Sequence, residues 1–174
     1  MTIKAQTYGQ FSHRVPIKTA TTSLSVINGN YGKIKEGAIC SVCGLIYRHK
    51  RWIKSEVLPF HIREHGKETL CPACAKIKYN KPGGIVSIKW DNIKEDSEEL
   101  LNLIKNVGER AISINVLDRI IKVKENKNNV EVETTSGVLA QRIGRAVEKT
   151  YHGNLCYIWS KNEKLVRVQW QGVT

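Results

Sequence analysis

Cys40-Ser-Val-Cys43-Gly44 and Cys71-Pro-Ala-Cys74 are the two stretches that decide how the first half of this chain folds. Each Cys-x-x-Cys turn places two thiolates on one small arc, so two such turns that face each other supply the four soft ligands of a closed tetrahedral Zn²⁺ site. Gly44 and Pro72 favour the tight backbone turns that a metal knuckle needs. The spacing therefore predicts a structural zinc ribbon with Cys40, Cys43, Cys71 and Cys74 as its ligands.

Paired cysteines also occur in disulfides and in thioredoxin-like redox sites. A thioredoxin-like motif needs one Cys-x-x-Cys that opens a helix of a βαβ unit, and neither pair has that context. The N-terminus lacks the apolar segment of a secretory signal, and no apolar stretch approaches the ~20 residues of a membrane span. We therefore expect a cytoplasmic protein with reduced thiols. The fifth cysteine, Cys156, is expected to be a small buried apolar residue of a strand.

Three histidines, His49, His61 and His65, lie between the two cysteine pairs. On a helix, His61 and His65 would share one face, and Glu64 beside them suggests a hydrolytic metal site. The order His-x-x-Glu-His and the complete set of four cysteines favour ordinary surface histidines instead. A catalytic or redox metalloprotein that uses these residues or a labile knuckle remains the alternative from a different class.

The net charge of +12 is concentrated in the half of the chain that carries the cysteine pairs. Residues 1–90 contain 15 Lys and Arg and 4 acids, a net charge of +11, whereas residues 91–174 contain 13 and 12, a net charge of +1. A one-sided basic surface favours a polyanion, because neutralised phosphates release their counterions. The cations do not form an amphipathic helix with a bulky apolar face, so nucleic acid is favoured over a membrane surface.

Residues 1–37 are predicted to form a basic flexible arm, because they contain too little apolar material to bury. The arm either threads into a nucleic-acid groove or remains a solvated tail. Residues 45–52 read as a strand in which cations alternate with aromatic side chains that can stack on unpaired bases. A second basic run follows the second knuckle, and a bound metal would bring the two runs together. The predicted contacts from the arm and the ribbon are Arg14, Lys33, Lys35, Tyr47, Arg48, Lys50, Arg51, Trp52, Lys76, Lys78 and Lys81.

From residue 83 the sequence becomes regular. We predict strands at 84–90, 116–124, 130–135, 155–159 and 165–170, a helix at 92–107 that Asn92 caps and Gly108 ends, and a helix at 137–151. Turns are expected at 126–129 and 161–163. The second helix should bury one face, formed by Leu139, Ile143, Ala146, Val147 and Thr150.

The order βαββαβ with one further strand predicts a ferredoxin-like α+β domain, in which two helices cover one face of an antiparallel sheet. The turn at 126–129 sets a register that places Lys124 opposite Glu131 and Lys122 opposite Glu133. This sheet face would be charge-paired and lacks the aromatic pair of RNA-recognition strands, so it is not assigned as an RNA surface. Three cations of the second helix, within about 60° on a helical projection, are either further contacts or a solvated stripe. They are Arg142, Arg145 and Lys149.

The motifs also carry a resemblance to a known family. The runs Cys-x-x-Cys-Gly-x-x-Tyr, Cys-Pro-Ala-Cys-Ala-Lys-Ile and Pro-Gly-Gly, with Leu-Asp-Arg-Ile at 117–120 and the segment 134–146, resemble those of a family of little-characterised prokaryotic zinc-ribbon proteins. More distantly, they are similar to the N-terminal half of the large-ribosomal-subunit export adaptor of archaea and eukaryotes. In that adaptor family, paired knuckles precede an α+β domain, and the protein binds ribosomal RNA and proteins. The resemblance implies ribosome or RNA binding, and by motif only the four paired cysteines correspond.

The sequence thus predicts three regions: an arm at 1–37, a zinc ribbon at 38–82 and a ferredoxin-like domain at 83–174. The expected function is a non-enzymatic, zinc-binding protein that associates with the ribosome or ribosomal RNA, and with ribosomal proteins as possible further partners. No membrane partner and no small-molecule substrate are expected, since no phosphate-cradling loop, Ser/His/Asp set or carboxylate pair has a supporting context. A DNA-binding regulator is the other alternative.

Overall fold

The computed structural model describes residues 34–54, 67–90, 97–160 and 164–173. Most of the predicted arm, with Arg14 and Lys33, lies outside these residues. So do His61, Glu64 and His65, the predicted cap at Asn92 and the predicted turn at 161–163. The described residues form two compact units, 34–79 and 80–173, which we call the cysteine unit and the C-terminal unit.

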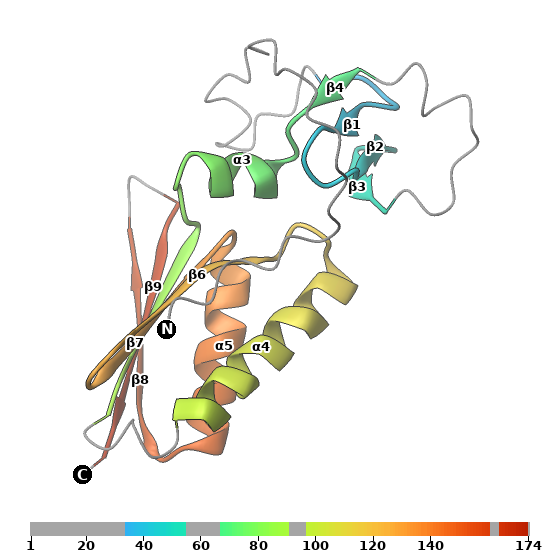
Figure 1. Ribbon diagram of the computed structural model, residues 1–174. Helices are drawn as coiled ribbons and strands as arrows, with labels where there is room; N and C mark the ends of the chain where they lie inside the picture. The colour runs from blue at the N-terminus through green and yellow to red at the C-terminus, as the bar shows by residue number, and fades with distance from the viewer. Residues whose placement is uncertain (1–33, 55–66, 91–96, 161–163, 174) are drawn as a thin grey trace. The chain divides into compact units, whose positions relative to one another are not determined.

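The cysteine unit contains four short strands and one helix (Figure 1). The strands are β1 (Ile39–Cys40), β2 (Ile46–Arg48), β3 (Arg51–Ile53) and β4 (Glu68–Thr69), and the helix is α3 (Pro72–Lys78). The sheet order is β3-β2-β1-β4, with β1 and β4 parallel and the other neighbours antiparallel.

The single strand predicted at 45–52 is wrong, because the chain reverses direction in the middle of it. His49 and Lys50 have φ angles of 48° and 61°, and this left-handed backbone makes a two-residue turn between β2 and β3. Arg48 pairs with Arg51 beside the turn, and Tyr47 pairs with Trp52 one step further in. The result is a tight hairpin instead of one extended strand.

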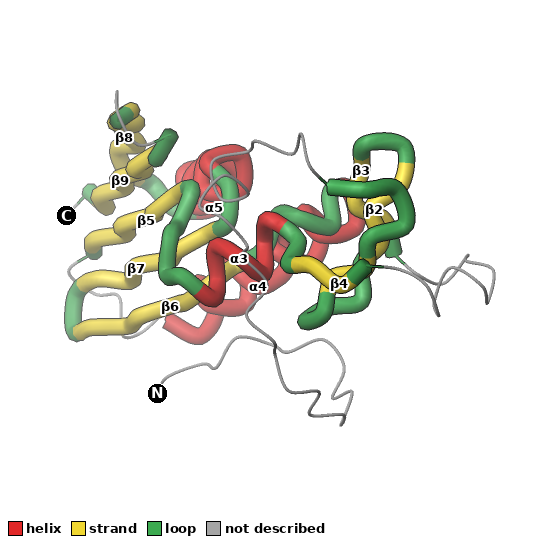
Figure 2. Tube along the Cα trace, turned by 90° about the horizontal axis from the view of Figure 1, so that it is seen from above, coloured by secondary structure: helices red, strands yellow, loops and turns green. Residues whose placement is uncertain are grey.

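The C-terminal unit is an α+β layer with five strands and two helices (Figure 1). Its elements in chain order are β5 (Gly84–Lys89), α4 (Ser97–Ile114), β6 (Ile120–Asn126), β7 (Asn129–Thr134), α5 (Gly137–Thr150), β8 (Gly153–Trp159) and β9 (Val166–Gly172). Both helices lie on one side of the sheet (Figure 1), and Figure 2 shows its strands lying side by side next to the helices. We call the other side of the sheet the open face.

The sheet is mixed, so the prediction of a fully antiparallel, ferredoxin-like sheet is wrong for one pair of strands. Its order is β6-β7-β5-β9-β8, and β5 pairs with β9 in parallel. The last hairpin places β9 inside the sheet and β8 at its edge. Every second residue of β9 (Val166, Val168 and Trp170) is buried, whereas no residue of β8 is fully buried. The strand that buries more apolar surface therefore takes the interior position.

The core lies between the helices and the sheet. The strands β5 and β7 contribute alternate residues to it, such as Val86 and Ile88 opposite Val132 and Val130. The helices contribute Leu100, Ile104, Leu139, Ile143 and Val147, and the last three were expected on the buried face of the second helix. Thr150, expected to be buried, is exposed and donates its hydroxyl to the carbonyl oxygen of Ala146 at 2.9 Å.

The predicted end of the first helix at Gly108 is wrong, because α4 continues to Ile114. Gly108 is buried, and a Cβ added there would lie 2.8 Å from Cδ1 of Ile120. This glycine allows close packing inside the helix and does not end it. The helix ends at Ile114, and the side-chain oxygen of the next residue, Asn115, accepts the Leu117 N–H at 3.2 Å. Because of this turn, the next strand begins at Ile120 and not at the predicted residue 116.

Cys156 was expected to be buried, and this is wrong. It is exposed on the open face, opposite Gln169 of β9. Residues of a strand alternate between the two faces, and the neighbouring Leu155 and Tyr157 are the ones that pack against the core.

The predicted register of the β6–β7 hairpin is confirmed: Lys122 pairs with Glu133 and Lys124 with Glu131. Lys124 makes both ion pairs, at 3.0 Å to Glu131 and 2.8 Å to Glu133. Hydrogen bonds to Glu133 and then to Glu131 raise the pKa of Lys124 above its ordinary value of 10.5. This stabilisation is therefore fully present below pH 10.5 and is lost as the pH rises through the raised pKa.

Replacing Lys124 with methionine should lower the free energy of unfolding by about 1 kcal/mol, because it leaves the largely buried Glu133 carboxylate without its cation. The side chain of Lys124 is 41% exposed, so solvent screening keeps the loss small. Lys122→Met is the matched control on the same strand and face, and should change stability by less than about 0.5 kcal/mol. Urea unfolding of both variants measures the difference, and equal losses would contradict the assignment of the ion pairs to Lys124.

Candidate metal centre

The first cysteine pair lies in a tight turn after β1. The Gly44 N–H donates to the carbonyl oxygen of Cys40 at 2.9 Å, and the Cys40 N–H donates to that of Leu45 at 2.7 Å. Gly44 has a φ angle of +68°, which a residue with a side chain adopts only with strain. Gly44, which was predicted to favour the tight turn of this knuckle, therefore occupies a position where a side chain would strain the backbone.

The second cysteine pair begins α3. Cys71 is the N-cap residue, and its Sγ accepts the Cys74 N–H at 3.4 Å. Pro72 occupies the first turn, where a residue without an N–H leaves no helical hydrogen bond unmade. Cap and first turn thus bring the sulfurs of Cys71 and Cys74 to the same end of the helix.

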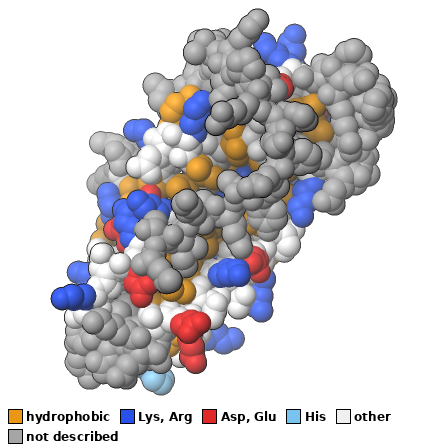
Figure 3. All heavy atoms as spheres, viewed as in Figure 1, with side chains coloured by type: hydrophobic (Ala, Val, Ile, Leu, Met, Phe, Trp, Pro, Cys, Tyr) orange, Lys and Arg blue, Asp and Glu red, His pale blue; other side chains and the backbone are white. Residues whose placement is uncertain are grey.

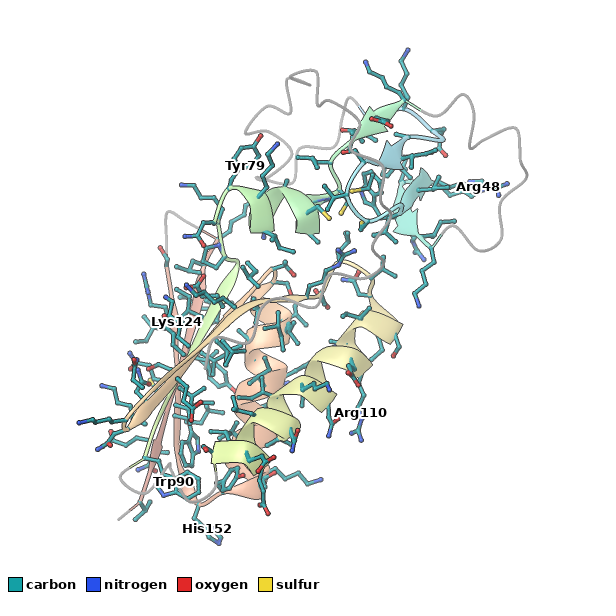
Figure 4. All side chains as sticks on the ribbon, viewed as in Figure 1. Arg48, Tyr79, Trp90, Arg110, Lys124 and His152 are labelled. Atoms are coloured by element: carbon teal, nitrogen blue, oxygen red, sulfur yellow. The ribbon has the colours of Figure 1, made fainter. Side chains whose placement is uncertain are left out.

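The four sulfur atoms meet between α3 and the strands, as the yellow atoms of Figure 4 show. All of them lie within 4.8 Å of one another, and Sγ of Cys43 is 3.6 Å from Sγ of Cys71. Around a tetrahedral metal with metal–sulfur distances of ~2.3 Å, neighbouring sulfurs are about 3.8 Å apart. The four cysteines of the prediction therefore form a group that could hold a metal ion.

The cysteine side chains are enclosed by protein. Cys40, Cys71 and Cys74 are buried and Cys43 is partly buried. The Cys71 N–H also donates to Sγ of Cys40 at 3.3 Å, and N–H groups pointing at sulfur stabilise a thiolate. A closed set of four sulfur ligands suits a soft divalent cation in a structural role.

The thiols also influence one another's protonation. The hydrogen bond with Cys43 raises the pKa of Cys40, but the hydrogen bonds with Cys71 and Cys74 outweigh it and lower that pKa to about 7. Hydrogen bonding to Cys40 raises the pKa of both Cys71 and Cys74, and burial raises them further. A cation that binds all four sulfurs would displace the remaining thiol protons, so metal binding should release protons.

The β2–β3 turn carries four consecutive exposed basic side chains, Arg48, His49, Lys50 and Arg51, which we call the basic tip. Their backbone is braced by Glu36, whose carboxylate accepts the His49 N–H at 2.9 Å and the Lys50 N–H at 3.4 Å. This role of Glu36 was not predicted, because a contact between residues 13 apart leaves no local pattern in the sequence.

Tyr47 and Trp52, predicted to stack on bases, do not lie on the surface. They are 7% and 6% exposed, and their ring centroids are 5.5 Å apart inside the cysteine unit. The prediction that they form a stacking surface is therefore wrong in this structure. Their apolar rings contribute to a small core that supports the hairpin.

Among the described residues of this unit, the exposed aromatic residue is Tyr79, just beyond α3. It is 41% exposed, and Nζ of Lys78 lies 5.8 Å from the centre of its ring. Figure 4 shows Arg48 and Tyr79 at opposite ends of the cysteine unit, so the expectation that the two basic runs become neighbours is wrong. Lys35 is also exposed, and Lys76 is half-buried.

The remaining predicted contacts belong to the C-terminal unit. Lys81, Arg145 and Lys149 are exposed, which fits either a contact surface or a solvated stripe. Arg142 is half-buried, and one of its guanidinium nitrogens is buried with no hydrogen-bond partner among the described residues. Arg142 is therefore less accessible than its two neighbours on α5.

Comparison of the chain with protein-family models, curated proteins and solved structures found no match. Within the described residues, no helix combines the length and the apolar character needed to cross a membrane.

Proposed function

We propose that this chain is a non-enzymatic zinc protein that binds ribosomal RNA and acts on the ribosome, in its assembly, its protection or the regulation of translation. Zn²⁺ is the proposed metal, because four cysteine sulfurs in one enclosed group are the donor set that structural zinc sites use. With all four positions taken by protein, the ion has no open position for a substrate, which supports a structural role. The proposed location is the cytoplasm, where thiols stay reduced.

The basic tip is the observation that supports the nucleic-acid partner. Its four side chains are exposed, and a hairpin tip can approach a phosphate backbone from outside. Among the described residues, the cysteine unit carries eight Lys and Arg and two acids. Most of the red acidic side chains visible in Figure 3 lie over the C-terminal unit instead. A cationic surface on a metal-braced hairpin is suited to phosphate contacts that position the protein.

Ribosomal RNA is proposed as the partner because of the resemblance of the knuckle motifs to prokaryotic zinc-ribbon proteins and to the ribosomal-subunit export adaptor. Exposed Tyr79 with its neighbouring Lys78 adds one stacking position, which single-stranded loops of structured RNA can use. We propose no membrane partner and no small-molecule substrate.

Sedimentation of the native protein with ribosomes tests this function. The protein should pellet with ribosomes at low salt and be released as salt rises, and it should bind purified ribosomal RNA with a similar salt dependence. Metal analysis should give one zinc per chain. Preference for duplex DNA of one sequence would favour a DNA-binding regulator. A second, exchangeable metal or thiol turnover would favour the catalytic or redox alternative.

A further inference from the structure

The strand β8 ends the five-stranded sheet on one side (Figure 2). It pairs with β9 over its whole length, Gly153–Trp159, and no strand among the described residues pairs with its other edge. The Ser160 N–H donates to the Leu165 carbonyl and the Val173 N–H to that of His152. Because antiparallel hydrogen bonds recur at every second residue, the backbone groups of Leu155, Tyr157 and Trp159 point away from the sheet.

The two edges of this sheet differ in how they are protected against further pairing. The other edge strand, β6, carries Lys122, Lys124 and Glu125 and has an irregularity between Ile120 and Lys122. Charged side chains and bulges are the devices by which natural sheets prevent edge pairing. The strand β8 is as long as β6 and contains no charged residue and no proline. It is therefore the edge of this sheet that can accept another strand.

Two apolar side chains stand exposed at the end of β8. Trp159 is 63% exposed and pairs with Val166 on the helix side of the sheet. Ile158 is 43% exposed and pairs with Arg167 on the open face. An added strand would meet one apolar side chain on each of its faces, and contacts with alternate side chains give strand addition its specificity.

The surroundings of this edge are basic. The charged residues of α5, β8 and β9 are four cations and one acid: Arg142, Arg145, Lys149, Arg167 and Glu148. Arg167 is exposed beside Ile158 on the open face. Arg145 follows Gly144, which approaches Leu155 of β8 so closely that an added Cβ would lie 3.1 Å from Leu155 Cδ1. Arg167 therefore lies beside the edge on the open face, and the cations of α5 lie on the helix side of the sheet.

We propose that β8 binds an extended acidic segment of a partner protein, which joins the sheet as its outermost strand. The unpaired N–H and C=O groups recognise a peptide backbone, and the flanking cations select glutamate and aspartate side chains. Pairing of β8 with a second copy of this chain would bring the same cations together, in proteins that each carry a net charge of +12. An RNA strand has no backbone amides to pair with these edge groups.

A short peptide of alternating glutamate and valine, labelled with a fluorophore, is the probe for this site. Fluorescence anisotropy should show binding that is about tenfold tighter than that of the matching lysine–valine peptide and that weakens as salt rises. The same glutamate peptide with alternate amide nitrogens methylated should not bind, since it cannot donate to the edge. Equal binding of all three peptides would overturn the proposal, and so would full displacement of the glutamate peptide by single-stranded RNA.

Hydrogen exchange locates the binding on β8. In the free protein, the N–H groups of Cys156 and Ile158 face β9 and should exchange slowly, whereas those of Leu155 and Tyr157 face outward and should exchange quickly. The glutamate peptide should slow the exchange of the outward pair by about tenfold or more and leave the inward pair unchanged. No change at Leu155 and Tyr157 in the presence of saturating peptide would place the peptide elsewhere and overturn the proposal.

Two variants distinguish the contribution of the Trp159 N–H to peptide binding from that of the Trp159 ring. Trp159→Pro removes an outward N–H without touching the pairing with β9, and edge strands tolerate proline at such positions. Trp159→Ala removes the exposed ring and keeps the N–H. Binding should fall several-fold in the alanine variant and disappear in the proline variant, with inward exchange protection as the check that both are folded. Unchanged binding by a folded proline variant, or a wild-type dimer that this variant dissociates, would contradict the proposal.

Discussion

Replacing Cys71 with serine is expected to abolish binding of the proposed zinc ion and to unfold the cysteine unit. Structural zinc sites contribute apparent binding free energies of roughly 10–16 kcal/mol to folding, more than a unit with such short strands can replace. Serine is itself a good N-cap residue, so the start of α3 should not be what fails. The loss would then come from ligation, because Sγ of Cys71 belongs to the sulfur group and lies 3.6 Å from Sγ of Cys43.

Metal analysis and amide NMR spectra measure this result. Zinc content should fall from one per chain to none, and the signals of residues 34–79 should collapse to unfolded positions while those of the C-terminal unit stay dispersed. Cys156→Ser is the matched control, because this exposed cysteine is not in the sulfur group, and it should keep both zinc and fold. Full zinc content in the Cys71 variant would refute the assignment of the ligands.

Reversing the charge of Arg48, Lys50 and Arg51 to glutamate is expected to abolish binding to ribosomes and ribosomal RNA. The triple variant removes three phosphate contacts and adds three repulsive charges at an exposed tip. Losing three contacts should lower the slope of log K against log salt by about 2 to 3. The tip side chains are exposed, and Tyr47 and Trp52 hold the hairpin from inside, so the fold should be unaffected.

The matched control reverses three exposed cations of the C-terminal unit, Lys105, Arg110 and Lys127, which changes the net charge by the same amount. Its affinity for ribosomes should fall only because the overall positive potential of the protein is weaker, and the slope of log K against log salt should not change. Reversal of Lys122 and Lys124 should mainly cost stability, through the lost ion pairs of Lys124. If either of these variants loses binding while the tip variant keeps the wild-type slope, the footprint lies on the C-terminal unit.

Local patterns in the sequence predicted most of the regular elements of the C-terminal unit. The strand predicted at 84–90 corresponds to β5, and the helix predicted at 137–151 corresponds to α5, which Ser136 caps by accepting the Leu139 N–H at 3.1 Å. The short turn after Asn126 fixed the pairing of β6 with β7. In each case, interactions between residues close in sequence determine the structure, so these elements can be predicted from one sequence.

The wrong predictions concern features that residues close in sequence do not determine. Leu155, Tyr157 and Trp159 alternate as Val166, Val168 and Trp170 do, so their apolar pattern cannot show which strand lies inside the sheet. The same holds for Tyr47 and Trp52, whose rings suit either a small core or a stacking surface. The four cysteines were predictable as a group because metal chemistry fixes their number and spacing. The bracing of the basic tip by Glu36 was not, since it depends on a tertiary contact.

The interior position of β9 also determines when the C-terminal unit can finish folding during synthesis. Its parallel neighbour β5 is translated some eighty residues earlier. The edge of β5 that pairs with β9 therefore stays unpaired until Val166 to Gln171 have been synthesised. A nascent chain that ends just after β8 contains both helices and four of the five described strands of the C-terminal unit but lacks β9, which lies between β5 and β8. Such late, non-local closure slows folding and leaves an apolar sheet edge open to other nascent chains. The unit should therefore gain protease resistance in one late step, when β9 has left the ribosome.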